Sequence, residues 1–275
     1  MVEAMPTMAP ARIIVAPNGA RKTRADHPAL PLTIGQLAAC AQRCRAAGAD
    51  GLHGHVRGAD GNHLLDAGLY RELIAEMARQ VPGMPVQITT EAVGRYRPEE
   101  QRAVVRAVAP EAFSAALKEL FADGDDAATT ALYGWAAEAG IEVQHILYAA
   151  EEVARFAALL DAGSIPPPAG SQSGARHQLL FVLGRYAADL QSDPAALLPF
   201  LRQLDASGLS QRVEWMVCAF GRAESAALGS ALARGGHARV GFENAFDNAD
   251  GSRARDNAER VAEVVALARS LGRRR

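Results

Sequence analysis

Short apolar runs alternate with longer amphipathic stretches along the whole of the 275-residue chain. The apolar runs have the length and β-branched content typical of strands, and they span 11–17, 51–56, 85–90, 111–117, 141–147, 178–184, 212–220 and 237–243. Stretches with helical periodicity follow them at 34–49, 66–80, 98–107, 126–139, 150–162, 194–206, 223–233 and 253–271. Strands that alternate with helices in this way predict a parallel sheet covered by helices.

Eight strand–helix pairs within about 260 residues predict a closed barrel, because that is the repeat and size of a (β/α)8 domain. We therefore place the chain in the α/β class, as a single TIM barrel over 11–275 preceded by a loose N-terminal segment at 1–10. An open, doubly wound sheet is the alternative. The NGARKT segment after the first strand lacks the glycine fingerprint of dinucleotide-binding folds, and no P-loop sequence occurs.

Charge and hydropathy exclude several classes of partner. A formal net charge of -2 gives no electrostatic basis for binding nucleic acid. No apolar run reaches the roughly 20 residues of a membrane helix, and the first ten residues lack the apolar core of a signal peptide. Cys40, Cys44 and Cys218 lack zinc-ribbon spacing and are interpreted as buried thiols. We expect a cytoplasmic protein without membrane partners, whose last residues, 273–275, form a solvated end.

The second predicted strand contains two histidines in the sequence GLHGHVRG, at 51–58. Alternate residues of a strand point to the same face, so His53 and His55 project together with Arg57 beside them. Two imidazoles on one face resemble half of a metal site. We interpret the remaining histidines as structural or surface residues, with His63 and His177 at the surface.

The same alternation turns further polar residues toward the barrel interior. In the eighth strand the apolar residues face the helices, which leaves Arg239 and Glu243 inward. In the third strand the inward residues are Gln87, Thr89 and Glu91. Burying a charge without a partner costs on the order of several kcal/mol. So many polar and charged residues inside the barrel therefore indicate a functional site.

Two imidazoles and a carboxylate at neighbouring barrel positions are a typical ligand set for zinc with one open coordination position. His53, His55 and Glu243 therefore predict a metal site at the barrel mouth. A hydrogen-bonded polar layer without metal is the alternative that spacing alone leaves open.

Four segments, in order, resemble the β-keto acid cleavage enzymes, a family whose type member acts in lysine fermentation. They are APNGARKTRADHPALPLT at 16–33, HGHVR at 53–57, QITTEAVG at 87–94 and GGHARVGFEN at 235–244. The similarity covers nearly the whole chain and is weakest from about residue 112 to 235. It implies a zinc-binding (β/α)8 barrel that converts a β-keto acid and acetyl-CoA into acetoacetate and a new acyl-CoA.

The resemblance also implies roles for individual residues. The metal ligands are His53, His55 and Glu243, the same three that the strand alternation turns inward. Arg239 is expected to hold negative charge near the reacting carbons, and the hydroxyl of Thr89 to contact the substrate. In the first loop, Asn18, Gly19 and Ala20 match the segment in which the family binds its substrate.

Asn244 departs from the family at a position that is usually acidic and serves as the base. An amide cannot take up a proton, so either another group acts as the base or the activity is altered. Glu91, inward on the third strand, is the nearest carboxylate that could replace it. The alternative is that Glu91 forms a salt bridge with Arg95 or Arg57.

Two further departures make the site less acidic. Arg21 occupies the loop position where the lysine-fermentation enzyme has a glutamate for the substrate's amino group, which favours an anionic or neutral acyl end. A solvated arginine without a role is the alternative. Gln144 replaces an inward glutamate of the fifth strand and is the remaining candidate for substrate binding.

The leading hypothesis is a zinc-dependent acyltransferase with two small-molecule substrates, a β-keto acid and acetyl-CoA, in a homo-oligomer (a dimer or a tetramer). A zinc hydrolase using the same three ligands is a second hypothesis. A diverged barrel that binds a keto acid or acyl-CoA without turnover is a third, and Asn244 is the residue that favours it.

Overall fold

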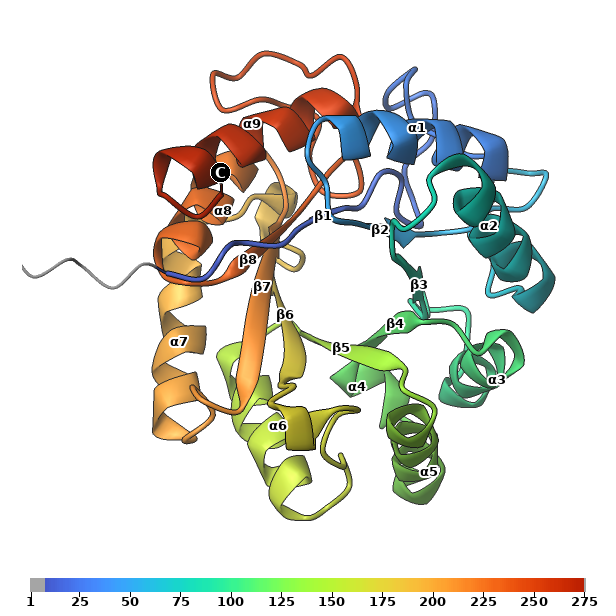
Figure 1. Ribbon diagram of the computed structural model, residues 1–275, viewed down its shortest axis with the longest axis vertical. Coiled ribbons are helices and arrows are strands. Elements are labelled where there is room, and N and C mark those ends of the chain that lie inside the picture. The colour runs from blue at the N-terminus through green and yellow to red at the C-terminus, as the bar shows by residue number, and fades with distance from the viewer. Residues whose placement is uncertain (1–7, 275) are drawn as a thin grey trace, which may run out of the picture.

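The structure, a computed structural model, describes residues 8–274, in which eight parallel strands close into one barrel (Figure 1). The strands pair in chain order and β8 returns to pair with β1. They are β1 (Ile13–Val15), β2 (Gly51–Gly54), β3 (Val86–Thr89), β4 (Ala112–Ala116), β5 (Glu142–Leu147), β6 (His177–Leu183), β7 (Val213–Ala219) and β8 (His237–Val240). The TIM barrel is thereby confirmed against the open sheet. Residues 1–7 of the expected N-terminal segment lie outside the described residues.

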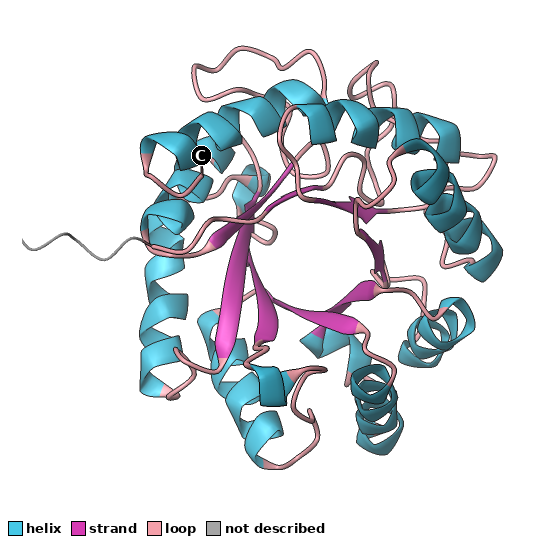
Figure 2. Ribbon diagram, viewed as in Figure 1, coloured by secondary structure: helices cyan, strands magenta, loops and turns pink. Residues whose placement is uncertain are grey.

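Helices surround the barrel on its outside (Figure 2). They are α1 (Ile34–Ala46), α2 (Ala67–Gln80), α3 (Pro98–Val108), α4 (Leu117–Leu120), α5 (Asp126–Glu138), α6 (Ala150–Asp161), α7 (Leu197–Ala206), α8 (Glu224–Ala233) and α9 (Asn257–Ser270). The short α4 and two 3-10 turns, η1 (Ser171–Ser173) and η2 (Ala188–Leu190), are additions to the predicted elements. A third 3-10 turn, η3 (Pro194–Ala196), forms the start of the helix predicted over 194–206. Within the described chain no helix is both long and apolar enough to cross a membrane.

Side-chain caps begin several helices. The hydroxyl of Thr33 accepts the backbone N–H of Gln36, whose side chain accepts the N–H of Thr33 in return, which makes a capping box at the start of α1. Asp66 and Asp256 accept the third N–H groups of α2 and α9 in the same way. Each cap satisfies a donor that has no partner within its helix, and is worth about 1 kcal/mol.

The barrel interior is divided into an apolar and a polar half. The apolar half comes from β4 to β7 and their ends, where one cluster contains Ala116, Ile146, Leu180, Val182, Met216, Cys218 and Phe220. On the other side, β2, β3 and β8 contribute His53, Thr89 and Arg239, all buried. A site inside this barrel is therefore lined by apolar side chains on one side and by polar side chains on the other.

The second and eighth strands end two or three residues earlier than expected, and polar residues of the site lie just beyond their ends. β2 ends at Gly54 and β8 at Val240, so His55 and Glu243 stand in the following turns. Gly241 makes the turn after β8 at a φ of +145°, where a side chain would collide with the backbone of Ala16. The inward direction that we predicted for Glu243 is retained, although strand alternation no longer applies there.

Residues 273 and 274 pack against the barrel, which corrects the expectation of a solvated end for these two, whereas residue 275 lies outside the described residues. Arg273 is 1% exposed, and its guanidinium donates to four backbone carbonyls, those of Ala9, Leu232, Gly235 and Gly236. Arg274 forms a bidentate ion pair with Asp50, at 2.8 and 3.0 Å. Arg273 thus caps the C-terminal end of α8 and joins it to the segment that precedes β1.

Replacement of Arg273 by alanine is expected to lower the free energy of unfolding by about 2–4 kcal/mol, because buried carbonyls lose a charged donor. Urea denaturation followed by circular dichroism measures the change. Arg222, whose side chain is 79% exposed, is the matched control, and Arg222→Ala is expected to change stability by less than about 0.5 kcal/mol. Equal stability of Arg273→Ala and the wild type would contradict the capping role.

Candidate active site

A cavity of about 110 Å³ opens at the carboxyl ends of the strands, and we call it the rim cavity. Its polar wall comes from β2, β3, β8 and the turns that follow them, with His53, His55, Thr89, Glu91, Arg239 and Glu243. Its apolar wall contains Ile146, Tyr148, Val182, Leu190 and Phe220. The loop after β1 adds Asn18, Gly19, Ala20, Arg21 and Lys22, and Arg185 follows β6. Chemistry in TIM barrels takes place at this end.

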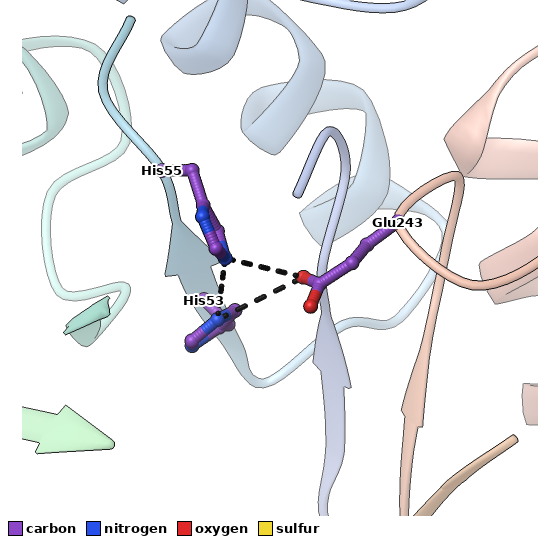
Figure 3. Close-up of side chains that lie close together, drawn as sticks. All are labelled: His53, His55 and Glu243. Atoms are coloured by element: carbon purple, nitrogen blue, oxygen red, sulfur yellow. Dashed lines mark hydrogen bonds and ion pairs between the residues drawn. The ribbon is translucent and has the colours of Figure 1, made fainter. Parts of the chain in front are cut away.

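His53, His55 and Glu243 converge in this cavity (Figure 3). The Nε2 atoms of the two histidines lie 3.1 Å apart. The Oε2 atom of Glu243 lies 3.7 Å from Nε2 of His53 and 3.6 Å from Nε2 of His55. Among the described residues this is the one group of three histidine, cysteine or acidic side chains with ligand atoms so close together. The predicted trio is therefore brought together by the fold.

Both imidazoles are held in the neutral form that can bind a metal. Burial, with Arg239 nearby, lowers the pKa of His53 to about 4, and burial beside His53 lowers that of His55 well below its usual value. The Nδ1 atom of His53 lies 2.7 Å from the side-chain oxygen of Gln87. Donation of that N–H to Gln87 leaves the lone pair of His53 on Nε2, facing Glu243.

Arg239 keeps the third member of the trio charged. Its Nη2 atom lies 3.1 Å from Oε1 of Glu243. Burial alone would raise the pKa of Glu243, but Arg239 and other nearby cations hold it below the usual value. The Nε and Nη1 atoms of Arg239 are buried and have no hydrogen-bond partner among the described residues. They are donors available to an anionic ligand.

The trio fits a zinc ion. Ligand atoms about 2.0–2.2 Å from zinc at tetrahedral angles lie about 3.3–3.6 Å from one another, close to the three separations observed here. The Oε2 atom of Glu243 is buried and has no hydrogen-bond partner within the described chain, as expected of an atom reserved for a cation. Two imidazoles and one carboxylate also leave a coordination position open for a substrate.

The loop after β1 is held against the trio. Asn18 donates its amide to the backbone carbonyl of His55 at 2.9 Å. Gly19 has a φ of +60°, and a Cβ there would lie 2.6 Å from Cγ of Glu243, so only glycine permits this approach. The guanidinium of Arg57 donates to the carbonyls of Gly19 and Lys22. Arg57, which we expected inside the barrel, therefore braces this loop and does not line the rim cavity.

Glu91 follows β3 and reaches the rim cavity. Burial and the neighbouring Glu243 raise its pKa to about 7. Its carboxylate pairs with Arg185 at 3.7 Å and lies 4.0 Å from Nδ1 of His55. The ion-pair partner is thus Arg185, and neither Arg95 nor Arg57, the partners considered from the sequence. Thr89 accepts the backbone N–H of Glu91 at 3.0 Å, so its hydroxyl also shapes this turn.

Cations from the loops complete the rim cavity. Arg21 is exposed and lines it, in the place that we predicted. Lys22 and Arg185 also line it and were missed by the sequence reasoning. Burial lowers the pKa of Lys22 to about 8, and its Nζ atom lies 4.3 Å from the ring centroid of Phe246. The run ARK at 20–22 was the available signal for Lys22, whereas Arg185 follows β6 without a recognisable motif.

Two predicted site residues lie elsewhere. Gln144 is buried lower in the barrel, with its side-chain nitrogen 3.7 Å from the sulfur of Met216. Ile146 of β5 and Tyr148, just after it, line the rim cavity instead. Asn244 is buried, and its side-chain amide has no partner among the described residues, but it does not line the rim cavity. Neither residue lines the rim cavity, although Asn244 directly follows Glu243 in the sequence.

Two histidines that we expected at the surface are buried, which corrects that expectation. His63 lies behind the trio, with its ring centroid 5.1 Å from that of His55 and its Nε2 atom 3.1 Å from the carbonyl oxygen of Glu91. His177 begins β6 and is 7% exposed.

Comparison with known proteins agrees with the resemblance found in the sequence. The model of the beta-keto acid cleavage enzyme family matches residues 10–275. A protein of Fusobacterium nucleatum named 3-keto-5-aminohexanoate cleavage enzyme is 28% identical over 268 residues, which are 95% of this chain and 92% of that protein. A protein of Cupriavidus necator named 3-oxoadipate:acetyl-CoA acetyltransferase is 26% identical over 271 residues, 96% of this chain and 90% of that protein.

Among solved structures, ObcA bound to oxaloacetate is similar, with a TM-score of 0.66 and 16% identity over 88% of this chain. The chain spans 64% of the length of ObcA, and at this identity the likeness supports the barrel fold alone. The family match, in contrast, extends over nearly the full sequence and confirms the resemblance seen in the four segments. The chain belongs to the beta-keto acid cleavage enzyme family.

Proposed function

We propose that the protein is a zinc-dependent acyltransferase that converts a β-keto acid and acetyl-CoA into acetoacetate and a new acyl-CoA. The convergence of His53, His55 and Glu243 beside Arg239 in the rim cavity is the observation that carries this proposal. Family membership supports the reaction, and the name of the relative from Cupriavidus necator includes acetyl-CoA.

Zinc held by the trio would supply a Lewis acid for the keto oxygen of the substrate. The chain's own residues supply the rest of the environment. The free Nε and Nη1 donors of Arg239 bind the negative charge of the reacting acid. Asn18 and Gly19 bring backbone groups of the first loop to the same place, and Thr89 lines the wall beside them. The apolar wall excludes water from the acyl chain.

The first test is the reaction itself. Purified protein supplied with zinc, acetyl-CoA and a panel of β-keto acids is expected to form acetoacetate, measured by coupled assay, and to bind one zinc, measured by elemental analysis. His55→Ala and Glu243→Gln are expected to lower zinc affinity by more than about 100-fold, since even outer partners of a ligand contribute about 10–100-fold. His63→Gln, the matched control at a neighbouring histidine, is expected to retain zinc.

The other possible results of this test would each support a different function or contradict the metal centre. Keto acid breakdown that does not depend on acetyl-CoA would replace the acyltransferase with a hydrolase. Tight binding of keto acid or acyl-CoA without product would identify a non-catalytic barrel, as the amide at Asn244 allows. A wild type that binds no zinc when zinc is abundant would contradict the proposed metal centre.

Glu91 is proposed as the residue that moves the proton, in place of the acid missing at Asn244. Within the described residues Glu91 and Glu243 are the carboxylates of the rim cavity, and Glu243 belongs to the trio. Glu91→Gln is expected to lower kcat by about 100- to 10,000-fold, the range of general acid–base catalysis, while zinc content stays at one equivalent. An unchanged kcat in the zinc-loaded variant would remove Glu91 from the mechanism.

Arg21 is proposed to select the acyl end of the substrate. Arg21, Lys22 and Arg185 all line the rim cavity, which favours a carboxylate there over an ammonium. Of the two relatives, one is named for an amino-substituted keto acid and the other for 3-oxoadipate, which has a second carboxylate.

Arg21→Glu is therefore expected to shift the ratio of kcat/KM values from β-keto dicarboxylates toward amino-substituted β-keto acids by about tenfold or more. The shift is measured with a matched pair of such substrates. Arg24→Glu changes the net charge equally on an exposed residue that does not line the rim cavity, and is expected to leave the ratio unchanged. Equal behaviour of the two variants would dismiss the selection role of Arg21.

A further inference from the structure

A second cavity, of about 400 Å³, lies at the opposite end of the barrel, and we call it the base cavity. It is bounded by the first residues of β5 and β6, by the end of α5 and by the loop 165–169. Glu142 begins β5 and His177 begins β6, so the cavity is at the amino ends of the strands, away from the trio. Figure 1 shows β5 and β6 side by side, with α5 and α6 against them. The proposed reaction makes no use of this region.

Two buried polar side chains line the base cavity without a partner. Tyr133, on α5, and His145, on the outward face of β5, are each 2% exposed. Neither the Tyr133 hydroxyl nor the His145 Nδ1 atom makes a hydrogen bond within the described chain. A buried polar group left without a partner costs about 1–3 kcal/mol, and native structures contain few of them. Two on one cavity wall indicate a ligand that completes them.

The wall that these residues form is aromatic and uncharged. The His145 ring centroid lies 5.2 Å from that of Tyr133, 4.9 Å from that of Phe156 and 6.1 Å from that of His177. Burial lowers the pKa of His145 to about 3 and that of His177 to about 4, so both rings are neutral at pH 7. Burial raises the pKa of Tyr133, which keeps its phenol protonated.

The charged groups on the floor of the base cavity are paired with one another. Arg12 donates to Glu142 at 3.3 Å and lies 4.0 Å from Glu214. Gln178 accepts from Arg12 and donates to Glu214 at 3.2 Å, which closes the network. Each of these groups is therefore already engaged with a neighbour. The remaining charged residue of the base cavity, Arg176, is exposed to solvent, so the buried wall offers no unpaired charge to an ionic ligand. The other side is covered by an apolar roof, Ile165 and the three prolines at 166–168.

We propose that the base cavity is a binding site for an uncharged aromatic or heteroaromatic ring with a polar substituent that both donates and accepts a hydrogen bond. The substituent pairs with Tyr133 and His145, each of which can donate or accept. The ring lies between the proline roof and the aromatic wall, in a cavity of the size that small-molecule sites have. This site is independent of the proposed reaction at the rim cavity.

Three fluorinated probes with the same ring test this site by fluorine NMR titration. 4-Fluorophenol is neutral at pH 7, whereas 4-fluorobenzoate is an anion and 4-fluorobenzylamine a cation. We expect saturable broadening and shift of the 4-fluorophenol signal, and at least tenfold weaker binding of the two charged probes. Binding of either charged probe as tightly as 4-fluorophenol would overturn the proposed ligand class.

Tyr133→Phe and His145→Phe locate the binding, because each removes the polar atoms and keeps an aromatic ring. Each is expected to weaken 4-fluorophenol binding by about two- to tenfold, the effect of one lost neutral hydrogen bond. Both remove a buried polar atom without a partner, so the variants are expected to be at least as stable as the wild type in urea.

His55→Ala, a change at the trio, is the matched control and is expected to leave 4-fluorophenol binding unchanged. Acetoacetate formation by Tyr133→Phe and His145→Phe is expected to equal that of the wild type. Absence of saturable binding, or equal binding by the wild type and both phenylalanine variants, would overturn the site. Neither result depends on whether the proposed acyltransferase reaction occurs.

Discussion

The ion pair between Arg239 and Glu243 is the interaction on which the polar half of the barrel depends. A carboxylate buried beside two neutral imidazoles would take up a proton if nothing compensated its charge. Arg239, 3.1 Å from Glu243 and 3% exposed, supplies that compensation from inside the barrel. Arg239 also lines the rim cavity, and its remaining donors have no partner among the described residues, so one buried guanidinium keeps the trio anionic and still has donors to offer a ligand.

Closure of the barrel explains why residues so distant in the sequence meet. β8 pairs with β1, and β1 pairs with β2, so the turns after β8 and β2 lie on either side of the loop that follows β1. Gly19 in that loop touches Glu243 with no room for a side chain, and Arg57 holds the loop from the other side. The same closure sets an apolar wall from β5 to β7 opposite the trio, where an acyl chain can be shielded from water.

The sequence predicted which side chains point into the barrel, but it did not predict the level of each residue along the barrel axis. Alternation with a period of two places His53 and Arg239 inside the barrel, and the structure agrees. The same rule makes Gln144 inward, but it cannot distinguish Gln144 from Ile146, which shares the face two residues higher. The height of a residue depends on the stagger between neighbouring strands, which is a property of the closed barrel and of no single segment.

Two loop residues escaped prediction for a related reason, and they change the electrostatic character of the site. Lys22 and Arg185 follow strand ends where no periodicity applies, yet both line the rim cavity with Arg21 and Arg239. Four cations thus face two carboxylates, one of which belongs to the trio. Asn244 and Gln144, where the sequence departs from acidic residues of the family, lie outside the rim cavity, so its surplus of positive charge comes from the loops and from Arg239. Such a surplus favours keto acids and thioesters that are themselves anionic.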